Sequence, residues 1–205
     1  MKEENRAKRR DHILDIAVEV LAERGYRDAN MLEVARRAKA SKETLYSWFG
    51  DKRGLFEAVI RRNAASVQAV MADQLAADVP VEEALAAFGT ALLTLLTGDA
   101  AVALNRAAIA EAAGDRTLAE TLVAEGRQAT LPAFVRYLDG QAERGTLQLT
   151  APQHAAEDFL GLLMGDLQIR RLLGASAKPR KAQIEVRAMA ATEKFLRLYA
   201  PASPR

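Results

Sequence analysis

Residues 39–52 read KASKETLYSWFGDK, and this stretch decides how the first third of the chain folds. Ser41 is a strong N-cap, because its hydroxyl can accept a hydrogen bond from an amide of the first helical turn. Gly50 ends that helix, and Asp51 caps the next one. The stretch therefore predicts a short helix over 42–49, followed at once by a long helix.

The residues before this stretch predict two more helices. Between His12 and Arg24, apolar residues recur at i, i+3, i+4, i+7 and i+8, and Gly25 then supplies a stop. Asn30 caps a short helix that ends near Ala38. Helices of about two turns are marginal alone, so two of them in succession indicate a compact motif. The turn between them has the length of a helix-turn-helix.

The remainder of the chain is rich in Ala and Leu and keeps helical periodicity, with breaks at glycines and prolines. The predicted helices beyond the short ones cover about 52–76, 80–97, 100–113, 115–125, 128–144, 152–173 and 180–199. The predicted fold class is all-α, with about nine to ten helices. We expect a three-helix helix-turn-helix DNA-binding domain at residues 1–56, joined by a long helix to a second helical domain at residues 57–205.

Composition excludes several classes of site. The 205 residues include no cysteine, which excludes disulfides, thiolate metal sites and a cysteine nucleophile. The two histidines are isolated, and neither a glycine-rich phosphate loop nor a catalytic triad is present. We therefore expect no enzyme, no cofactor and no metal site. The charged start lacks a signal peptide. The uncharged stretch 84–98 is short for a membrane span, so we expect a cytoplasmic protein.

Charge is unevenly distributed along the chain. Residues 1–62 hold 15 Lys/Arg and 11 Asp/Glu, a balance of +4, whereas residues 63–205 have a balance of −2. A basic first third is typical of a protein that meets a polyanion there. Four basic residues near the start either attract DNA regardless of sequence or belong to a frayed terminus: Arg6, Lys8, Arg9 and Arg10.

The helix predicted over 42–49 has an inward and an outward face. Leu45, Trp48 and Phe49 lie at i, i+3 and i+4, so they should pack against the first helix. Polar residues remain outside, and a helix-turn-helix inserts such residues into the major groove. The candidate DNA-binding residues are Asn30, Lys39, Ser41, Lys42, Glu43, Thr44, Tyr46, Ser47 and Lys52. Taken singly, each lysine is also an ordinary solvated side chain.

These candidates differ in the chemistry that they offer to DNA. Lys42 can donate to guanine O6 and N7, and Glu43 can accept from cytosine N4. The hydroxyls of Thr44 and Tyr46 suit phosphate oxygens. Lys52 adds its charge to the amides at a helix start, which also suits a phosphate.

Residues 13–59 resemble the DNA-binding domain of the TetR family of bacterial transcription regulators. The resemblance rests on the runs ILDIAVEVLAERGY and NMLEVARRAKASKETLYSWFGDKRGLFEAVI. It implies that the recognition helix is Ser41–Phe49 and that Thr44, Tyr46 and Lys52 occupy positions that contact DNA in the family. The family often has glycine where this chain has Lys39. That residue is therefore either a strained turn residue, costing about 1 kcal/mol, or a further DNA contact.

The later sequence is similar to the AefR-like branch of this family. The similarity lies in LNRAAIAEAAGDRTLAETLVAEG and AAEDFLGLLMG. It implies that residues 57–205 form an all-helical ligand-binding and dimerisation domain, often in a repressor.

Two helices of this later part are apolar on two faces, the one predicted over 152–173 and the last. A helix of this kind is buried on both faces. Either a second copy or the monomer itself covers the second face. The predicted dimer interface consists of Phe159, Leu163, Leu167, Ile184, Ala188 and Phe195.

A ligand pocket is less visible in the sequence. The candidates are aromatic and long apolar residues, with three charges in apolar surroundings: Met71, Phe88, Leu92, Arg106, Glu111, Phe134, Tyr137, Met164 and Asp166. The apolar ones can equally be plain core, and the charges can pair with each other or face solvent.

The sequence thus predicts a sequence-specific DNA-binding transcriptional regulator, a homodimeric repressor on a palindromic operator. A small apolar or amphipathic effector would release it by changing the separation of the two recognition helices, and no membrane is involved. The alternative is a helical small-molecule carrier or binding protein without DNA affinity.

Overall fold

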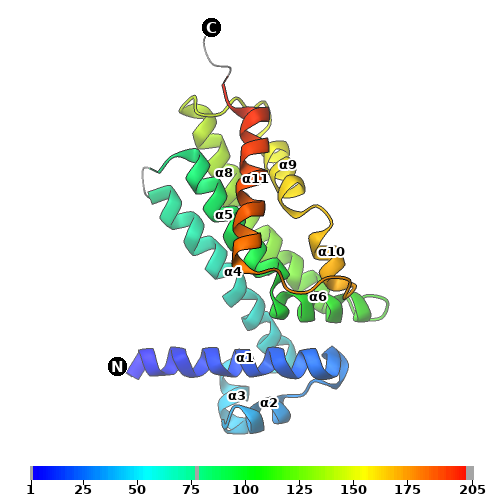
Figure 1. Ribbon diagram of the computed structural model, residues 1–205. Coiled ribbons are helices and arrows are strands. Elements are labelled where there is room, and N and C mark those ends of the chain that lie inside the picture. The colour runs from blue at the N-terminus through cyan, green and yellow to red at the C-terminus, as the bar shows by residue number, and fades with distance from the viewer. Residues whose placement is uncertain (1, 77–78, 202–205) are drawn as a thin grey trace. The chain divides into compact units, whose positions relative to one another are not determined.

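The computed structural model describes residues 2–76 and 79–201, and every regular element in them is a helix (Figure 1). The all-α prediction is confirmed. The elements are α1 (Lys2–Asp28), α2 (Met31–Arg37), α3 (Lys42–Phe49), α4 (Lys52–Ala76), α5 (Val81–Thr97), α6 (Asp99–Glu111), α7 (Thr117–Thr121), a π-helical segment η1 (Leu122–Arg127), α8 (Gln128–Glu143), α9 (Pro152–Met164), α10 (Leu167–Leu172) and α11 (Lys181–Tyr199).

The helices form two compact units that are not continuous in sequence. Unit 1 comprises Met1–Asn63 and Asp99–Gly126, and unit 2 comprises Ala64–Gly98 and Arg127–Arg205. The helix-turn-helix therefore shares a core with α6 and α7, whose Leu104 and Leu118 are almost fully buried beside the residues of α1. The predicted division into a DNA-binding domain at residues 1–56 and a ligand-binding and dimerisation domain at residues 57–205 stays a prediction.

The first helix begins ten residues earlier than its apolar periodicity predicts. It starts at Lys2, and the helical pattern continues to Asp28 across a kink at Gly25, where φ is 73°. The positive φ is the conformation that a glycine stop supplies. The segment before His12 is polar, so an apolar period could not identify it as helix.

The single helix predicted over 152–173 is wrong, because the chain breaks at Gly165 into α9 and α10. Gly165 has φ 47°, and the guanidinium of Arg187 from α11 donates to the carbonyls of Leu163 (2.6 Å) and Met164 (2.9 Å). A Cβ on Gly165 would lie 2.6 Å from Arg187 Nη2. A remote side chain thus satisfies the carbonyls at the end of α9, and a side chain at position 165 would force the guanidinium to shift from them.

Unit 2 is built around a line of aromatic rings. Phe88 stacks on Phe134 at 4.3 Å between ring centroids, Phe134 packs on Phe159 at 5.3 Å, and Phe159 meets Phe195 edge to face at 5.4 Å. All four side chains are at most 2 % exposed. Offset and edge-to-face pairs add to the stability gained from burial alone.

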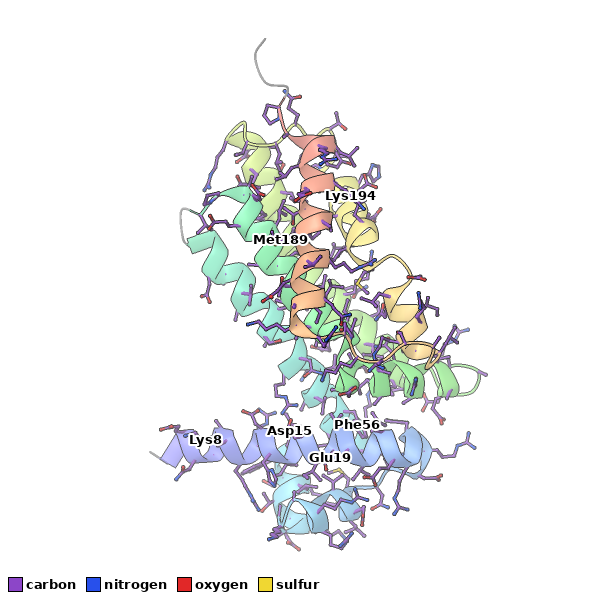
Figure 2. All side chains as sticks on the ribbon, in the orientation of Figure 1. Lys8, Asp15, Glu19, Phe56, Met189 and Lys194 are labelled. Atoms are coloured by element: carbon purple, nitrogen blue, oxygen red, sulfur yellow. The ribbon has the colours of Figure 1, made fainter. Side chains whose placement is uncertain are left out.

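This core includes most of the residues that were predicted to form the dimer interface. Phe159, Leu163, Ala188 and Phe195 are 0 % exposed within one chain, Ile184 is 6 % exposed, and Leu167 is half-buried. The five buried side chains have almost no surface left for a partner, so they belong to the monomer core, whereas Leu167 keeps part of its surface. Large apolar side chains that remain exposed on α11 are Val186, Met189 and Leu198; Met189 is labelled in Figure 2.

Across the described ranges, no single helix is long and apolar enough to cross a membrane, although α5 and α6 together, as a bent pair, meet that test by length and composition alone.

Candidate nucleic-acid interface

The two short helices of the helix-turn-helix, α2 and α3, each begin with a side-chain cap. Asn30 Oδ1 accepts from the amide of Glu33 at 2.9 Å, and Ser41 Oγ accepts from the amide of Thr44 at 3.1 Å. The hydroxyls of Ser41 and Thr44 also lie 3.0 Å apart. These three predicted DNA-binding side chains therefore already hold helix starts in place. Each cap of this kind contributes about 1 kcal/mol.

The recognition helix α3 has a buried and an exposed face. Leu45 is 0 % exposed and Phe49 7 %, and Trp48 packs half-buried against the same core. Four predicted contacts are exposed on the other side: Lys42, Glu43, Tyr46 and Ser47. The ammonium of Lys42 lies 5.6 Å from the centre of the Tyr46 ring. The ring is 44 % exposed, so part of its surface is available for a partner.

Glu43 carries a negative charge at the start of α3. Its pKa lies below the ordinary value, because the carboxylate accepts hydrogen bonds from its own backbone N–H and from the Ser41 hydroxyl. The Lys42 charge acts in the same direction. An anion here repels phosphates but can accept a hydrogen bond from cytosine N4. Glu43 is thus suited to reading a base rather than to general affinity.

Lys39, in the turn between α2 and α3, has φ 51°. Among the described residues it is the only non-glycine with a positive φ. This left-handed conformation costs a side-chain-bearing residue roughly 1–2 kcal/mol. Its carbonyl accepts a hydrogen bond from Arg9 Nη2. Lys39 is therefore the strained turn residue, and its side chain is also exposed.

Lys52 is committed to contacts inside unit 1. Its ammonium donates to the carbonyls of Tyr26 (2.8 Å) and Arg27 (3.1 Å) and lies 4.5 Å from the centre of the Tyr26 ring. These carbonyls are at the C-terminal end of α1, where a helix favours a cation. The predicted phosphate contact of Lys52 would have to coexist with this structural task.

An ion-pair network joins α2 to α1. Glu33 pairs with Arg36 (2.9 Å) and Arg37 (2.7 Å), and Arg37 also reaches Glu23 on α1 (2.6 Å). The hydrogen bonds from the two arginines lower the pKa of Glu33 from 4.5 to about 2. The network orients α2 on α1. The side chains of Glu33 and Arg37 are only 18 % and 23 % exposed, whereas Arg36 and Glu23 are 73 % and 53 % exposed, so water screens the two outer partners.

Sequence reasoning did not assign a definite role to the arginines at the start of α1. Arg6 lies over Trp48, Arg10 lies over Phe49, and Arg9 reaches the turn. Their spacing of i, i+3 and i+4 was the available signal, because it places them on one face of a helix.

The predicted pocket residues do not form one cluster. Phe88, Phe134 and Tyr137 are in the core of unit 2 with Leu92, and Met164 packs partly buried against it. The Met71 side chain lies outside the described residues. The Tyr137 hydroxyl is buried without a hydrogen-bond partner, and burial raises its pKa to about 12.

The three predicted pocket charges lie elsewhere. Arg106 is exposed on α6, in unit 1. Glu111, also on α6, lies 3.8 Å from the guanidinium of Arg27. Asp166 is 69 % exposed and lies 3.7 Å from Arg170.

An open groove of about 400 Å³ lies on the surface of unit 2, and none of the predicted pocket residues whose side chains are described lines it. Its lining is Arg127, Gln128, Leu131, Pro132, Val135, Arg136 and Gln153. In the part of the chain that the structure describes, no three acidic, histidine or cysteine residues are grouped to hold a metal ion.

The chain is similar to known transcription regulators along nearly its whole length. A solved TetR transcriptional regulator from Agrobacterium tumefaciens is 32% identical, with TM-score 0.72, over 93% of this chain and 94% of that chain. A protein assigned to the TetR family from Mesorhizobium loti MAFF303099 is 27% identical, with TM-score 0.78, over 95% and 98%. The uncharacterized HTH-type transcriptional regulator YvkB of Bacillus subtilis (strain 168) is 27% identical over 162 residues, 79% of this chain and 82% of its own length.

Two family models match the two parts of the chain. Residues 13–59 match the model described as bacterial regulatory proteins, tetR family, and include α2 and α3. Residues 83–201 match the model described as AefR-like transcriptional repressor, C-terminal domain. With the helix-turn-helix geometry and the whole-chain similarity, these matches show that the chain is a transcription regulator of the TetR family with an AefR-like C-terminal domain.

Proposed function

We propose that this regulator is a homodimeric repressor that binds a palindromic DNA operator and is released by a small apolar or amphipathic effector. The observation that carries the proposal is the exposed polar face of α3, whose buried face and N-cap hold it rigidly in unit 1. In a helix-turn-helix, the N-terminal residues of the second helix reach the base edges. Lys42 and Glu43 would read bases there, and the Tyr46 hydroxyl would meet a phosphate.

The exposed apolar stripe of α11 supports dimerisation. Val186 is 67 % exposed and Met189 56 %, three residues apart on the same face. On α9, Gly161 is exposed, and a Cβ added to it would meet nothing within 4 Å, so a partner helix could approach closely there. A second copy is the occupant that fits a palindromic operator, because two symmetric recognition helices read half-sites one or more turns apart.

The core of unit 2 suggests what kind of effector would bind. The core residues are aromatic and aliphatic, yet Tyr137 Oη and Thr192 Oγ1 are buried among them without hydrogen-bond partners. A buried hydroxyl without a hydrogen bond costs about 1–3 kcal/mol. A largely apolar effector with one hydrogen-bonding group would satisfy such a hydroxyl. An effector that weakens operator binding must itself bind more weakly to the DNA complex.

The direct test is selection of bound fragments from genomic DNA, followed by mobility-shift assays. Lys42→Ala and Glu43→Ala should change which bases are preferred, whereas Tyr46→Phe should weaken binding to every sequence. Lys181→Ala is the matched control for Lys42→Ala. It removes the same charge from unit 2, at a side chain that is 86 % exposed. Retention of no fragment above background at low salt would reject the proposal. A ligand-dependent rise in melting temperature without DNA binding would instead indicate a carrier. Because the proposed operator lies in bacterial DNA, we propose that the protein acts in the cytoplasm.

A further inference from the structure

The first turns of α1 contact the last turn of the recognition helix. The guanidinium carbon of Arg6 lies 5.5 Å from the centre of the Trp48 ring, and that of Arg10 lies 5.5 Å from the centre of the Phe49 ring. Guanidinium groups at this distance from an aromatic face are attracted by the ring quadrupole. Both rings belong to the side of α3 that faces the core. The N-terminal end of α1 therefore holds the C-terminal end of α3.

The same face of α1 also holds the turn that precedes α3. Arg9 stands between Arg6 and Arg10 in the helical spacing, and its Nη2 donates to the carbonyl of Lys39. Lys39 is the described non-glycine residue whose φ is positive, so its conformation persists only if its surroundings hold it. A charge-assisted hydrogen bond is one of the stronger ways to do so.

We propose that Arg6, Arg9 and Arg10 form a brace that positions the recognition helix. In this proposal the three arginines determine sequence discrimination by fixing both ends of α3, and they do not act by touching DNA themselves. The reason is geometric: base contacts require α3 to hold its orientation, whereas attraction to phosphates tolerates a tilt. The proposal rests on the proposed use of α3 to read the operator.

The competing role for three arginines at a DNA-binding surface is direct contact with phosphates. The two roles predict different salt behaviour. Each phosphate contact that is lost reduces the slope of log affinity against log salt by about 1, and it weakens operator and random DNA alike. Loss of a brace lowers affinity for the operator alone, and leaves the slope on random DNA unchanged.

The test compares Arg9→Gln with Lys8→Gln. Lys8 is the matched control, because it is adjacent, loses the same charge, is 71 % exposed and pairs with Glu4 only one turn away. The probes are a duplex of the selected operator and a scrambled duplex, each titrated at several salt concentrations. Arg9→Gln should weaken operator binding on the order of tenfold more than Lys8→Gln does. The two variants should bind the scrambled duplex with equal affinity. Arg9→Lys, which keeps a donor and a charge, should recover most of the loss.

Two results would overturn the brace. One is equal operator affinity for Arg9→Gln and Lys8→Gln. The other is a parallel loss on scrambled DNA with a smaller salt slope, which would assign Arg9 to a phosphate. Thermal unfolding of each variant tests whether it folds. If Arg9→Gln does not fold, Arg9→Lys provides the comparison.

A second measurement does not depend on DNA. Trp48 is the single tryptophan of the chain, so its emission and its quenching by acrylamide report on the brace directly. Arg6→Gln should increase quenching of Trp48 in the protein without DNA, and Lys8→Gln should not. Unchanged quenching in Arg6→Gln overturns the stacking part of the brace. If the wild type binds no fragment, the proposed function fails, whereas this measurement still decides whether the brace exists.

Lys39→Gly supplies an independent check of the Arg9 contact. Glycine adopts a positive φ without strain. The turn should then depend less on Arg9, so Arg9→Gln should cost less operator affinity in a Lys39→Gly background than in the wild type. An identical loss in both backgrounds would contradict the link between Arg9 and the strained turn.

Discussion

Replacement of Lys52 by methionine should destabilise unit 1 by about 2–3 kcal/mol. The ammonium donates to two carbonyls, of Tyr26 at 2.8 Å and of Arg27 at 3.1 Å, and lies over the Tyr26 ring at 4.5 Å. A hydrogen bond from a charged donor contributes about 1.5–3 kcal/mol, and an exposed cation–π contact about 0.5–1 kcal/mol. Two such hydrogen bonds and the cation–π contact sum to about 3.5–7 kcal/mol. Lys52 is only half-buried, so water replaces part of these contacts in the variant, and methionine keeps the packing of the aliphatic stem. The expected loss of about 2–3 kcal/mol is therefore below that sum.

The assay is urea and thermal unfolding followed by the fluorescence of Trp48, which reports on unit 1. For a chain of this size, 2–3 kcal/mol corresponds to a fall in melting temperature of roughly 4–12 °C. Lys42→Met is the control, because Lys42 is exposed and its ammonium lies only near the Tyr46 ring, at 5.6 Å. If the free energy of unfolding of Lys52→Met lies within about 0.5 kcal/mol of that of Lys42→Met, Lys52 does not stabilise the end of α1. A loss of operator affinity without any loss of stability would then identify it as a phosphate contact.

Four further variants have expected outcomes. Glu33→Gln should make the free energy of unfolding depend less on pH between 4.5 and 2. The folded pKa of Glu33 is lowered from 4.5 to about 2, so the wild-type carboxylate stabilises the fold above pH 4.5, and this contribution is lost as pH falls toward 2. Urea unfolding across this pH range measures the difference. Tyr137→Phe should raise stability at neutral pH by about 1 kcal/mol, because the buried hydroxyl has no partner. The same variant should resist alkaline unfolding, since the wild type loses stability as pH rises from 10 toward about 12; equal alkaline limbs would contradict this. Val186→Asp should shift sedimentation toward the monomer with little change in monomer stability, because the side chain is 67 % exposed, whereas an unchanged dimer would place the interface elsewhere. Phe195→Ala should lower the free energy of unfolding, measured with denaturant, by about 3–5 kcal/mol, because the ring is 0 % exposed in the core. A decrease below about 1 kcal/mol would show that neighbouring side chains repack to fill the cavity.

The recognition motif was predictable because its determinants are local. Asn30 and Ser41 bond to amides three residues ahead, and Gly50 ends a helix at its own position. Such interactions depend only on neighbours in the chain, so the pattern of residue types is enough to place α2 and α3. The inward set of α3 follows from helical spacing in the same way.

Burial against a particular partner was not predictable from spacing. The apolar periodicity of the last helix identified a second apolar stripe on α11, but it could not say whether the monomer or a second copy covers each stripe. The structure places Phe195 and Ala188 in the monomer core and leaves Val186 and Met189 exposed. Periodicity describes one helix, whereas the identity of the covering surface depends on how all helices of the unit pack.

The sequence by itself thus determined α2, α3, the helix-turn-helix that they form and the residues that α3 exposes, but not the first ten residues of α1. Only the tertiary structure decided the roles of side chains whose partners are distant in sequence. Arg187 donates to carbonyls at the end of α9 that lie 23 and 24 residues away in sequence, and Lys52 donates to carbonyls at the end of α1 that lie 25 and 26 residues away. Arg9 donates to the carbonyl of Lys39, 30 residues away. These long side chains can reach many alternative partners, and only the packing of the helices selects one.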